Sequence, residues 1–356
     1  RSYGLPSVAA QSVLAPSVPV SDQAVPVKGY DFNQPLDHNA LLNNMMTMGF
    51  QATNFATAVD AVNNMINWRG TAVEDKIDDR DNYIERTIPT KCTIFLGYTS
   101  NMVSCGNRDV IRYLVQNRMV DVLVTTGGGV EEDLIKCLAP HIMGSFHLDG
   151  RDLRRKGLNR IGNLIVPNDN YCKFEDWIMP ILRQLVVEQE NGAPILTPSS
   201  LCKRLGKEID NPDSILYWAY KNDIPVFSPA ITDGSLGDML YFNSYKHETD
   251  LIIDIVKDVK MINSIAVQAH QTGVIVLGGG LVKHHILNAN LMRNGANFSV
   301  FINTGNGWDG SDSGADPDES LSWGKLALDS HPVKINGDAS LIFPLLVAQT
   351  FAQKQK

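Results

Sequence analysis

Residues 120–138, "VDVLVTTGGGVEEDLIKCL", contain the arrangement that decides the fold. A short run of apolar and β-branched residues ends at two threonines, three glycines follow, and the remaining residues have helical spacing. Parallel strands need a crossover connection, which is usually a helix, and strands buried on both faces are nearly continuous apolar runs. This stretch therefore predicts one buried strand and one helix of an α/β fold.

The same unit recurs along the chain. Similar short apolar runs occur at "CTIFLG" (92–97), "NLIVP" (163–167), "IPVFSP" (224–229), "VIVLGG" (274–279) and "SVFINT" (299–304). Such strands, alternating with helical patterns, predict a doubly wound, mostly parallel sheet with helices on both faces. No second shift in composition marks a domain boundary, so we expect a single domain over residues 29–356.

The N-terminal part has a different character. Residues 1–28 hold four prolines among Ala, Ser and Val, which predicts a flexible arm. Within it, "SVAAQSVL" (7–14) has the composition for one or two helical turns. A helical period begins at Asp37 and predicts an N-terminal helical extension, with one apolar face formed by Phe55, Val59, Val62 and Ile66. Residues 71–88 mix both charge signs and predict an exposed connector.

Composition excludes several classes of protein. The 356 residues are 44% hydrophobic with a net charge of −8, which is typical of a soluble globular protein and unfavourable for nucleic-acid binding. No apolar run is long enough to cross a bilayer, and no signal peptide is visible. Five scattered cysteines without a C-x-x-C pair indicate reduced thiols. We expect a cytoplasmic protein with no nucleic-acid, membrane or metal partner.

Polar loops follow the expected strands. They are "TSNMVS" (99–104), "TTGGGVEED" (125–133), "TDGSLGD" (232–238), "GGGLVKHH" (278–285), residues 303–324 and "NGDAS" (336–340). Ligands of open α/β sheets bind at the carboxyl ends of the strands, so these loops predict one composite site. The two glycine triplets suit a phosphate group but depart from G-x-G-x-x-G, with Glu132 and Lys283 at the sixth position. Tight packing turns are the alternative.

Other polar residues allow two interpretations. Glu131 and Glu132 suit the start of a helix, where acids interact favourably with the helix dipole. Turn chemistry explains Asp233 and Asp238 equally well. The pair His284–His285 does not suit a metal site, because adjacent helical side chains point about 100° apart. A capping or core histidine is one interpretation of His284, and a catalytic base is the other.

Residues 303–324 form an acidic loop that carries five acids (Asp309, Asp312, Asp316, Asp318, Glu319) and no Lys or Arg. Lys325 follows it directly, and Trp308 and Trp323 lie within it. Carboxylates and indole rings together suit a slender organic polycation. A solvated acidic loop is the alternative. Lys325 is accordingly either a counter-charge or a nucleophile.

Longer blocks of this sequence resemble the deoxyhypusine synthase family from about Gly29 to the C-terminus. The resemblance rests on "TSNMVS" (99–104), "GGGVEEDLIKCLAP" (127–140), "FSPAITDGSLGDM" (227–239), "GGGLVKHHILNANLMRNGA" (278–296), "SDSGADPDESLSWGK" (311–325) and "DASLIFPLLVAQTFAQK" (338–354). It implies a Rossmann-like NAD-binding domain. The family uses NAD to oxidise spermidine, and then transfers its 4-aminobutyl group to a lysine of the eukaryotic translation initiation factor five-A precursor.

The resemblance also implies roles for individual residues. It makes Lys325 the lysine that forms the enzyme imine and His284 the acid/base. The implied spermidine contacts are Glu132, Asp238, Gly310, Ser311, Asp312, Glu319 and Trp323. The implied NAD contacts are Ser100, Asn101, Ser104, Thr126, Gly128, Glu132, Asp233, Gly279, Thr304, Asp338 and Ala339.

Family members form homotetramers with active sites at subunit interfaces, and an N-terminal segment can plug the site, a role for which residues 7–14 are the candidate. The sequence departs from the family where Gly127 replaces an alanine, where "GNGW" (305–308) replaces "AQEF", and where Asp316 replaces an arginine. Two alternatives remain open: a homospermidine synthase with putrescine as acceptor, and a non-catalytic regulatory paralogue.

Overall fold

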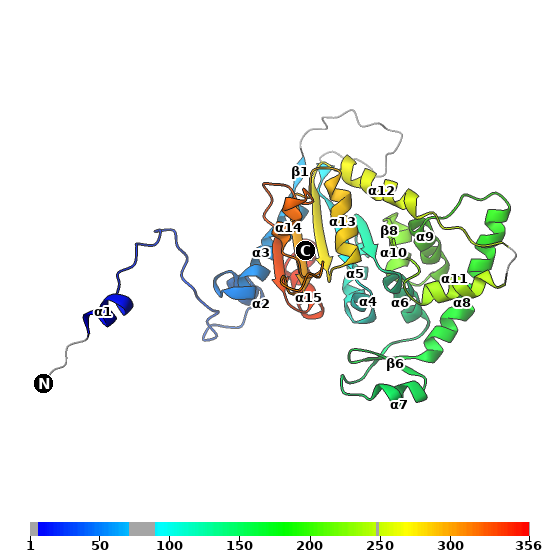
Figure 1. Ribbon diagram of the computed structural model, residues 1–356, viewed down its shortest axis with the longest axis horizontal. Helices are drawn as coiled ribbons and strands as arrows, with labels where there is room; N and C mark the ends of the chain where they lie inside the picture. The colour runs from blue at the N-terminus through cyan, green and yellow to red at the C-terminus, as the bar shows by residue number, and fades with distance from the viewer. Residues whose placement is uncertain (1–5, 71–89, 247–248, 356) are drawn as a thin grey trace.

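A six-stranded parallel sheet forms the centre of the molecule (Figure 1). The computed structural model describes residues 6–70, 90–246 and 249–355. The strands of the sheet, in spatial order, are β11 (Val333–Asn336), β10 (Phe298–Asn303), β9 (Thr272–Leu277), β3 (Thr93–Tyr98), β4 (Val122–Thr125) and β8 (Val226–Phe227). The predicted α/β class and parallel sheet are confirmed.

The order of the strands places a topological switch point between β3 and β9. From β3 the chain moves outward through β4 to β8, returns to β9 beside β3, and then moves outward on the other side through β10 to β11. Every residue of β3 and β9 is buried, as the continuous apolar runs predict. A ligand site is therefore expected beyond Tyr98 and Leu277, which pair at the carboxyl ends of these strands.

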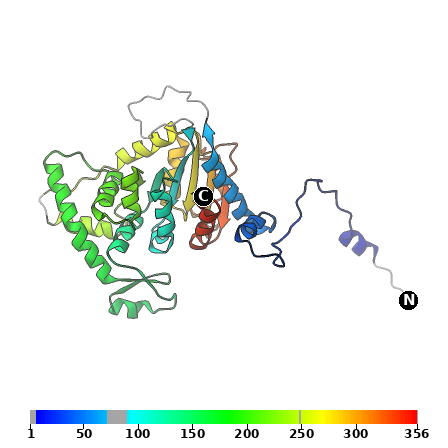
Figure 2. The same cartoon turned by 180° about the vertical axis from the view of Figure 1, so that it is seen from behind.

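Helices cover both faces of the sheet (Figures 1 and 2). One face packs against α3 (Phe50–Asn67), α5 (Asn107–Gln116) and α15 (Ala339–Gln349), and the other packs against α12 (Ile255–Gln268) and α13 (Leu281–Leu291). Alternate residues of a strand point to opposite faces, so that Ile94 and Leu96 belong to the first core and Phe95 to the second.

The remaining elements surround this sheet. They are α4 (Asn101–Ser104), α6 (Gly127–Leu138), α8 (Asn168–Glu190), α9 (Pro198–Ile209), α10 (Ile215–Asn222), α11 (Ser235–Ser244), α14 (Pro317–Ser322), the 3₁₀ helix η3 (Phe351–Gln355) and the short pair β1 (Arg69–Gly70) and β2 (Thr90–Lys91). Within the described ranges, no helix has both the length and the apolar composition of a membrane span.

The prediction that "NLIVP" belongs to the parallel sheet is wrong. Its strand, β7 (Leu164–Pro167), pairs antiparallel in a separate three-stranded sheet with β5 (Ile142–Met143) and β6 (Leu158–Ile161), beside α7 (Gly150–Arg155). Only Gly162 and Asn163 connect β6 to β7, and Gly162 has a φ of +58°. A two-residue turn with positive φ makes a hairpin and leaves no room for a crossover helix. The sixth parallel strand is β11.

The N-terminal helical extension is confirmed. Asp37 caps α2 (His38–Asn43) by accepting hydrogen bonds from the next backbone N–H groups, and the 3₁₀ helix η1 (Asn44–Thr47) leads into α3. Phe55 and Val62 of α3 are buried against the sheet. The helical turns expected in the arm form α1 (Ser7–Val13), which buries none of its residues. The connector expected over residues 71–88 lies outside the described residues, and the plug role of the arm stays a prediction.

Candidate active site

The first part of the site is the start of α6, directly after β4. The backbone of Gly128 lies against Ser100, since a Cβ atom at position 128 would be 2.8 Å from the Ser100 Cβ. The hydroxyl of Thr126 is buried and has no hydrogen-bond partner among the described residues. Helix-start N–H groups, glycine backbone and an unpartnered hydroxyl fit the diphosphate and ribose groups of a dinucleotide such as NAD.

Three consecutive acids of α6 each contact a different segment. Glu131 accepts a hydrogen bond from the backbone N–H of Leu236 at 2.5 Å, at the start of α11. Glu132 accepts one from the hydroxyl of Ser104 on α4. The acids lie beyond the first turn of α6 and are buried, so the helix dipole does not explain them. Burial, with a smaller contribution from Glu131, raises the pKa of Glu132 to about 7.

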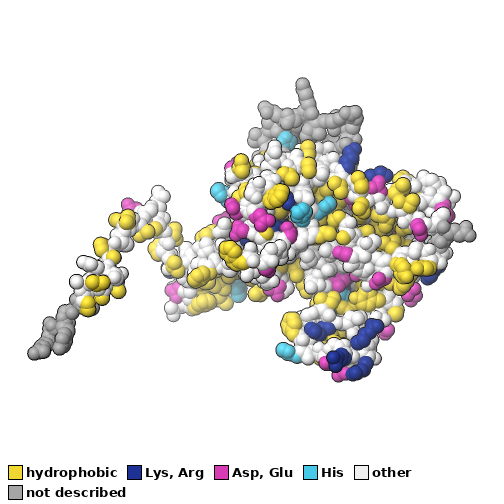
Figure 3. Space-filling model, viewed as in Figure 1, with side chains coloured by type: hydrophobic (Ala, Val, Ile, Leu, Met, Phe, Trp, Pro, Cys, Tyr) yellow, Lys and Arg dark blue, Asp and Glu magenta, His cyan; other side chains and the backbone are white. Residues whose placement is uncertain are grey.

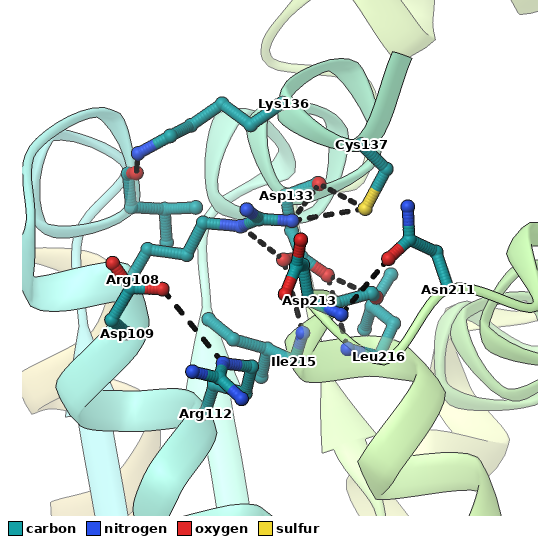
Figure 4. Close-up of polar contacts among 12 residues, drawn as sticks. Arg108, Asp109, Arg112, Asp133, Lys136, Cys137, Asn211, Asp213, Ile215 and Leu216 are labelled. Carbon is teal, nitrogen blue, oxygen red and sulfur yellow. Dashed lines mark hydrogen bonds and ion pairs between the residues drawn. The ribbon is translucent and has the colours of Figure 1, made fainter. Parts of the chain in front are cut away.

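The third acid, Asp133, is fully buried and connects α6 to α5 and α10 (Figure 4). Its Oδ1 accepts a hydrogen bond at 2.8 Å from Nε of Arg108, and the same Arg108 donates to the carbonyl oxygen of Asp133 at 2.9 Å. Its carboxylate also accepts from the hydroxyl of Ser214 and from the backbone N–H groups of Ile215 and Leu216. Asp133 therefore holds the start of α10 as well as a buried arginine.

Asp233 and Asp238 lie at the start of α11, next to α6. Asp233 approaches the first residue of α6 closely, because a Cβ atom at Gly127 would be 2.3 Å from its Oδ1. Asp238 is exposed in the first turn of α11. The structure thus brings these predicted residues together, and we call them the α6 group: Ser100, Asn101, Ser104, Thr126, Gly128, Glu132, Asp233 and Asp238.

The second part of the site surrounds Lys325, just beyond α14. Gly324 has a φ of +70°, which reverses the chain after the helix, and the backbone N–H of Lys325 bonds to the carbonyl of Ser320 at 3.0 Å. The carbonyl of Lys325 accepts from the backbone N–H of Ala296 at 3.1 Å. Its Nζ atom lies 5.7 Å from the centre of the Trp323 ring, within range of a cation–π interaction. The backbone on both sides of the lysine is therefore fixed.

His284 on α13 faces the acidic loop. Its Nδ1 lies 3.6 Å from Oδ1 of Asp312. The loop lies directly on the start of α13, because a Cβ atom at Gly279 would be 2.4 Å from the Cα of Ser313. We call the predicted residues gathered here the Lys325 group: Gly279, His284, Gly310, Ser311, Asp312, Glu319, Trp323 and Lys325.

Comparison with known proteins identifies the family of this chain. The sequence profile of the deoxyhypusine synthase family matches residues 40–350. This chain belongs to the deoxyhypusine synthase family. It is 59% identical to the deoxyhypusine synthase of Arabidopsis thaliana over 335 residues, which cover 92% of this chain and 90% of that protein. It is 52% identical to the Kluyveromyces lactis deoxyhypusine synthase, with 98% of each chain covered.

A solved structure supports the fold. The crystal structure of an Entamoeba histolytica protein, proposed to be a deoxyhypusine synthase, superposes with a TM-score of 0.68 at 34% identity. The match covers 92% of this chain and 97% of that one. Curated relatives with this name are enzymes, so this chain is a member of an enzyme family, and the homospermidine synthase and regulatory alternatives are not favoured.

Two lysines under the acidic loop were missed by the sequence analysis. Lys283 is buried, and its Nζ donates to the carbonyl oxygen of Asp312 at 2.5 Å. Lys334 donates to the carbonyl oxygens of Gly305 and Gly314. Burial lowers the pKa of Lys283, and the charges of Asp312 and Glu319 oppose this shift. The loop is thus held by cations that lie on other elements, and in the sequence Lys283 stands out only as a departure from a glycine motif.

The family departures have structural consequences. Asp316 caps α14 by accepting a hydrogen bond from the backbone N–H of Asp318 at 3.1 Å, which the family's usual arginine could not do. "GNGW" (305–308) lines a cavity of about 490 Å³ together with Thr304, Asp316 and Lys334. Thr304 is exposed there, at the end of β10. Asp338, another expected NAD contact, caps α15, while the carbonyl of Ala339 accepts from the side chain of Asn107 at 3.0 Å.

The two groups meet through neighbouring backbone segments, since a Cβ atom at Gly278, next to Gly279, would be 3.0 Å from Oγ1 of Thr99, next to Ser100. Over the ranges that the structure describes, no hydrogen bond or ion pair joins a side chain of the α6 group to one of the Lys325 group. The acids of the loop lie at the surface (Figure 3), with Trp308 94% and Trp323 65% exposed. The carboxylates of the acidic loop are therefore accessible to solvent and to a ligand.

Proposed function

We propose that this chain transfers the 4-aminobutyl group of spermidine to one lysine of the eukaryotic translation initiation factor five-A precursor, with NAD as cofactor and Lys325 as the covalent carrier. The observation that carries the proposal is the position of Lys325. Its amine lies over the Trp323 ring, on a backbone fixed by Ser320 and Ala296, in a group that also contains His284 and Asp312.

Spermidine is a flexible polycation, and the acids of the two groups supply its counter-charges. Asp312, Glu319 and Asp238 are exposed carboxylates that can each pair with an ammonium group. Glu132 differs because it is buried, with a pKa of about 7. A bound cation stabilises its charged form, so spermidine binding is coupled to the loss of a proton from Glu132.

His284 removes the proton from the secondary amine of spermidine. An imidazole suits a general base near neutral pH, and Oδ1 of Asp312 lies 3.6 Å from Nδ1 of this ring. The α6 group would hold NAD, which would supply the hydride acceptor for the carbon beside that amine and the hydride donor for the final product. The chain's contribution is to hold the secondary amine of spermidine beside His284, which accepts its proton, while the acids bind the ammonium groups on either side.

Lys325 then acts as a nucleophile. Its neutral amine attacks the imine carbon formed by oxidation of spermidine, and the bond from that carbon to the 1,3-diaminopropane nitrogen breaks. The aminobutyl group remains joined to Lys325 as an imine. The lysine of the protein substrate displaces Lys325 in a second exchange, which restores the free amine of the enzyme.

The α6 group would hold NAD. The backbone at Gly128, the hydroxyl of Thr126 and the side chains of Ser100, Asn101, Ser104 and Asp233 offer donors and acceptors for the diphosphate and the ribose hydroxyls. Gly279, Thr304, Asp338 and Ala339 are the further NAD contacts that the resemblance implies. The family's homotetramer would bring the α6 group of one copy to the Lys325 group of another and would cover the exposed Trp308 and Trp323. A cytoplasmic location and a single catalytic domain over residues 29–356 remain part of this proposal.

The test is to trap the covalent intermediate. The enzyme is incubated with NAD and spermidine radiolabelled in the butyl group, and borohydride is added. We expect label on wild-type protein and on Lys221→Arg, a control at an exposed lysine of α10, and none on Lys325→Arg. Equal labelling of Lys325→Arg would overturn the proposal. Addition of the factor precursor or of putrescine before borohydride then shows which acceptor removes the label.

A further inference from the structure

Lys136, in the last turn of α6, makes an unusual set of contacts. Its Nζ atom donates hydrogen bonds to three consecutive backbone carbonyl oxygens, those of Val103 at 2.9 Å, Ser104 at 3.1 Å and Cys105 at 3.1 Å. Figure 4 shows the side chain extended from α6 toward this backbone. The three protons of the ammonium group thus match three acceptors, all of them backbone carbonyl oxygens.

The accepting carbonyls lie at the end of α4, where a helix leaves its last carbonyl groups without internal partners. α4 has only four residues, Asn101–Ser104, which is too short to be stable by itself. A cation at a helix C-terminus satisfies these carbonyls and interacts favourably with the helix dipole. The hydrogen bonds from Lys136 therefore stabilise α4, which is too short to be stable alone.

The same turn is held at a second point by α6. The hydroxyl of Ser104 donates to Glu132, one helical turn before Lys136, while the carbonyl of Ser104 accepts from Lys136 itself. The hydroxyl and the carbonyl of Ser104 are thus both hydrogen-bonded to side chains of α6. Because Gly128 of that helix lies against Ser100, the position of α4 relative to α6 sets the shape of the region where NAD is expected to bind.

Lys136 is half-buried, among groups of both signs. Burial lowers its pKa, the charge of Arg108 acts in the same direction, and Asp109, Cys105 and Glu132 oppose the shift. His141 lies nearby, and burial followed by the charge of Lys136 lowers its pKa to about 4, so this ring is neutral near pH 7. Lys136 therefore supplies a cation to this turn, and the neutral ring of His141 does not replace it.

We propose that Lys136 is a positioning residue that holds residues 100–105, the cofactor turn, against α6 and thereby sets the affinity of the enzyme for NAD. This inference rests on the proposed function in assigning NAD to the turn. It assigns to Lys136 no contact with NAD or spermidine. Its substitution should loosen the turn and weaken NAD binding while affecting the maximal rate much less.

The first test needs neither NAD nor spermidine. Amide hydrogen exchange of the full-length protein is compared for wild type, Lys136→Met, Lys136→Arg and the control Lys207→Met, which changes an exposed lysine in the last turn of α9. We expect exchange in residues 100–105 to rise about tenfold in Lys136→Met, since the turn loses charge-assisted hydrogen bonds. Lys136→Arg keeps a multiple donor and should recover part of the protection, and Lys207→Met should match wild type.

The second test is NAD binding, measured by titration of the intrinsic tryptophan fluorescence. We expect the Kd for NAD to rise about tenfold in Lys136→Met and less in Lys136→Arg, with kcat at saturating NAD changed less than threefold. Unchanged exchange and unchanged Kd in Lys136→Met would overturn the inference. If that variant does not fold, Lys136→Gln replaces it, and wild-type exchange and Kd in Lys136→Gln overturn the inference equally. Failure of the proposed function appears elsewhere, as absence of label on wild-type Lys325.

Discussion

Nδ1 of His284 and Oδ1 of Asp312 lie 3.6 Å apart, and the contact joins a helix that follows β9 to the loop that follows β10. Both side chains remain partly exposed, so the pair can open toward a bound substrate. The histidine is thereby placed beside one acid of a loop that carries five. An imidazole and a carboxylate are thus combined at one point of the sheet edge.

Substitution of either partner should have a distinct kinetic effect. His284→Ala removes the proposed general base, and we expect spermidine cleavage to slow by about 10²–10⁴-fold. Asp312→Asn removes a charge-assisted contact, and we expect the KM for spermidine to rise about tenfold or more. Steady-state kinetics of cleavage without protein acceptor measures both. The control is Asp318→Asn, which changes an exposed acid of the same loop to which no role is assigned. An unchanged KM in Asp312→Asn would contradict the proposed contact of Asp312 with spermidine.

Burial of Glu132 predicts a dependence of stability on pH. Its pKa is raised from the ordinary 4.5 to about 7, so the folded state binds more protons than the unfolded chain between these values. The stabilisation by the protonated form is complete below about pH 4.5 and is lost as pH rises through about 7. The contribution is about 1.4 kcal/mol per pKa unit. Thermal unfolding of Glu132→Gln and wild type from pH 5 to 8 measures it.

In that comparison the melting temperature of wild type should fall relative to Glu132→Gln as pH rises toward 7, and the difference should then become constant. Glu131, whose pKa burial also raises, is present in both proteins and cancels to first order. Parallel curves over the whole range would show that Glu132 is not perturbed in the folded enzyme.

Disruption of the buried ion pair Arg108–Asp133 should greatly lower the free energy of unfolding. Arg108→Met leaves the carboxylate of Asp133 buried without its cation, at a cost of about 3–5 kcal/mol. Arg155→Met breaks the exposed pair Arg155–Asp152 and should cost less than about 1 kcal/mol. Urea unfolding of both variants beside wild type gives the two values. Equal losses would mean that burial of the first pair has no energetic consequence.

Gly127 should control the approach of Asp233 to α6. In Gly127→Ala the new Cβ atom would lie 2.3 Å from Oδ1 of Asp233 and 2.9 Å from the carbonyl oxygen of Ile231. Alanine is the family's usual residue here, but in this chain the backbone of residues 230–231 closes on the glycine, so the new Cβ overpacks at a cost of about 1–3 kcal/mol. We expect displacement of Asp233 and weaker NAD binding. Gly106→Ala is the matched control, since no atom lies within 4 Å of its new Cβ. NAD affinity equal to wild type in Gly127→Ala would contradict this prediction.

Several features could be predicted from the sequence because they depend on local patterns. The buried strands β3, β4, β9 and β10 are continuous apolar runs, and the α3 face follows the helical period through Phe55 and Val62. The hairpin of β6 and β7 was mistaken for part of the parallel sheet, because an apolar run does not reveal its partner strand. The two-residue turn at Gly162 is the feature that indicates a hairpin. Strand β11 has only four residues, two of them polar, so its sequence does not form an apolar run.

The sequence by itself determined the α/β class, the positions of most strands and, through its motifs, the residues that form the candidate site. Only the tertiary structure decided how those residues are grouped. It placed Lys283 and Lys334 beneath the acidic loop and Lys136 at the end of α4, contacts between residues far apart in sequence. These side chains bind backbone carbonyl oxygens, which every residue type provides, so no sequence motif identifies the acceptor. The physical reason is burial: a lysine removed from water takes whichever carbonyls the fold brings within reach.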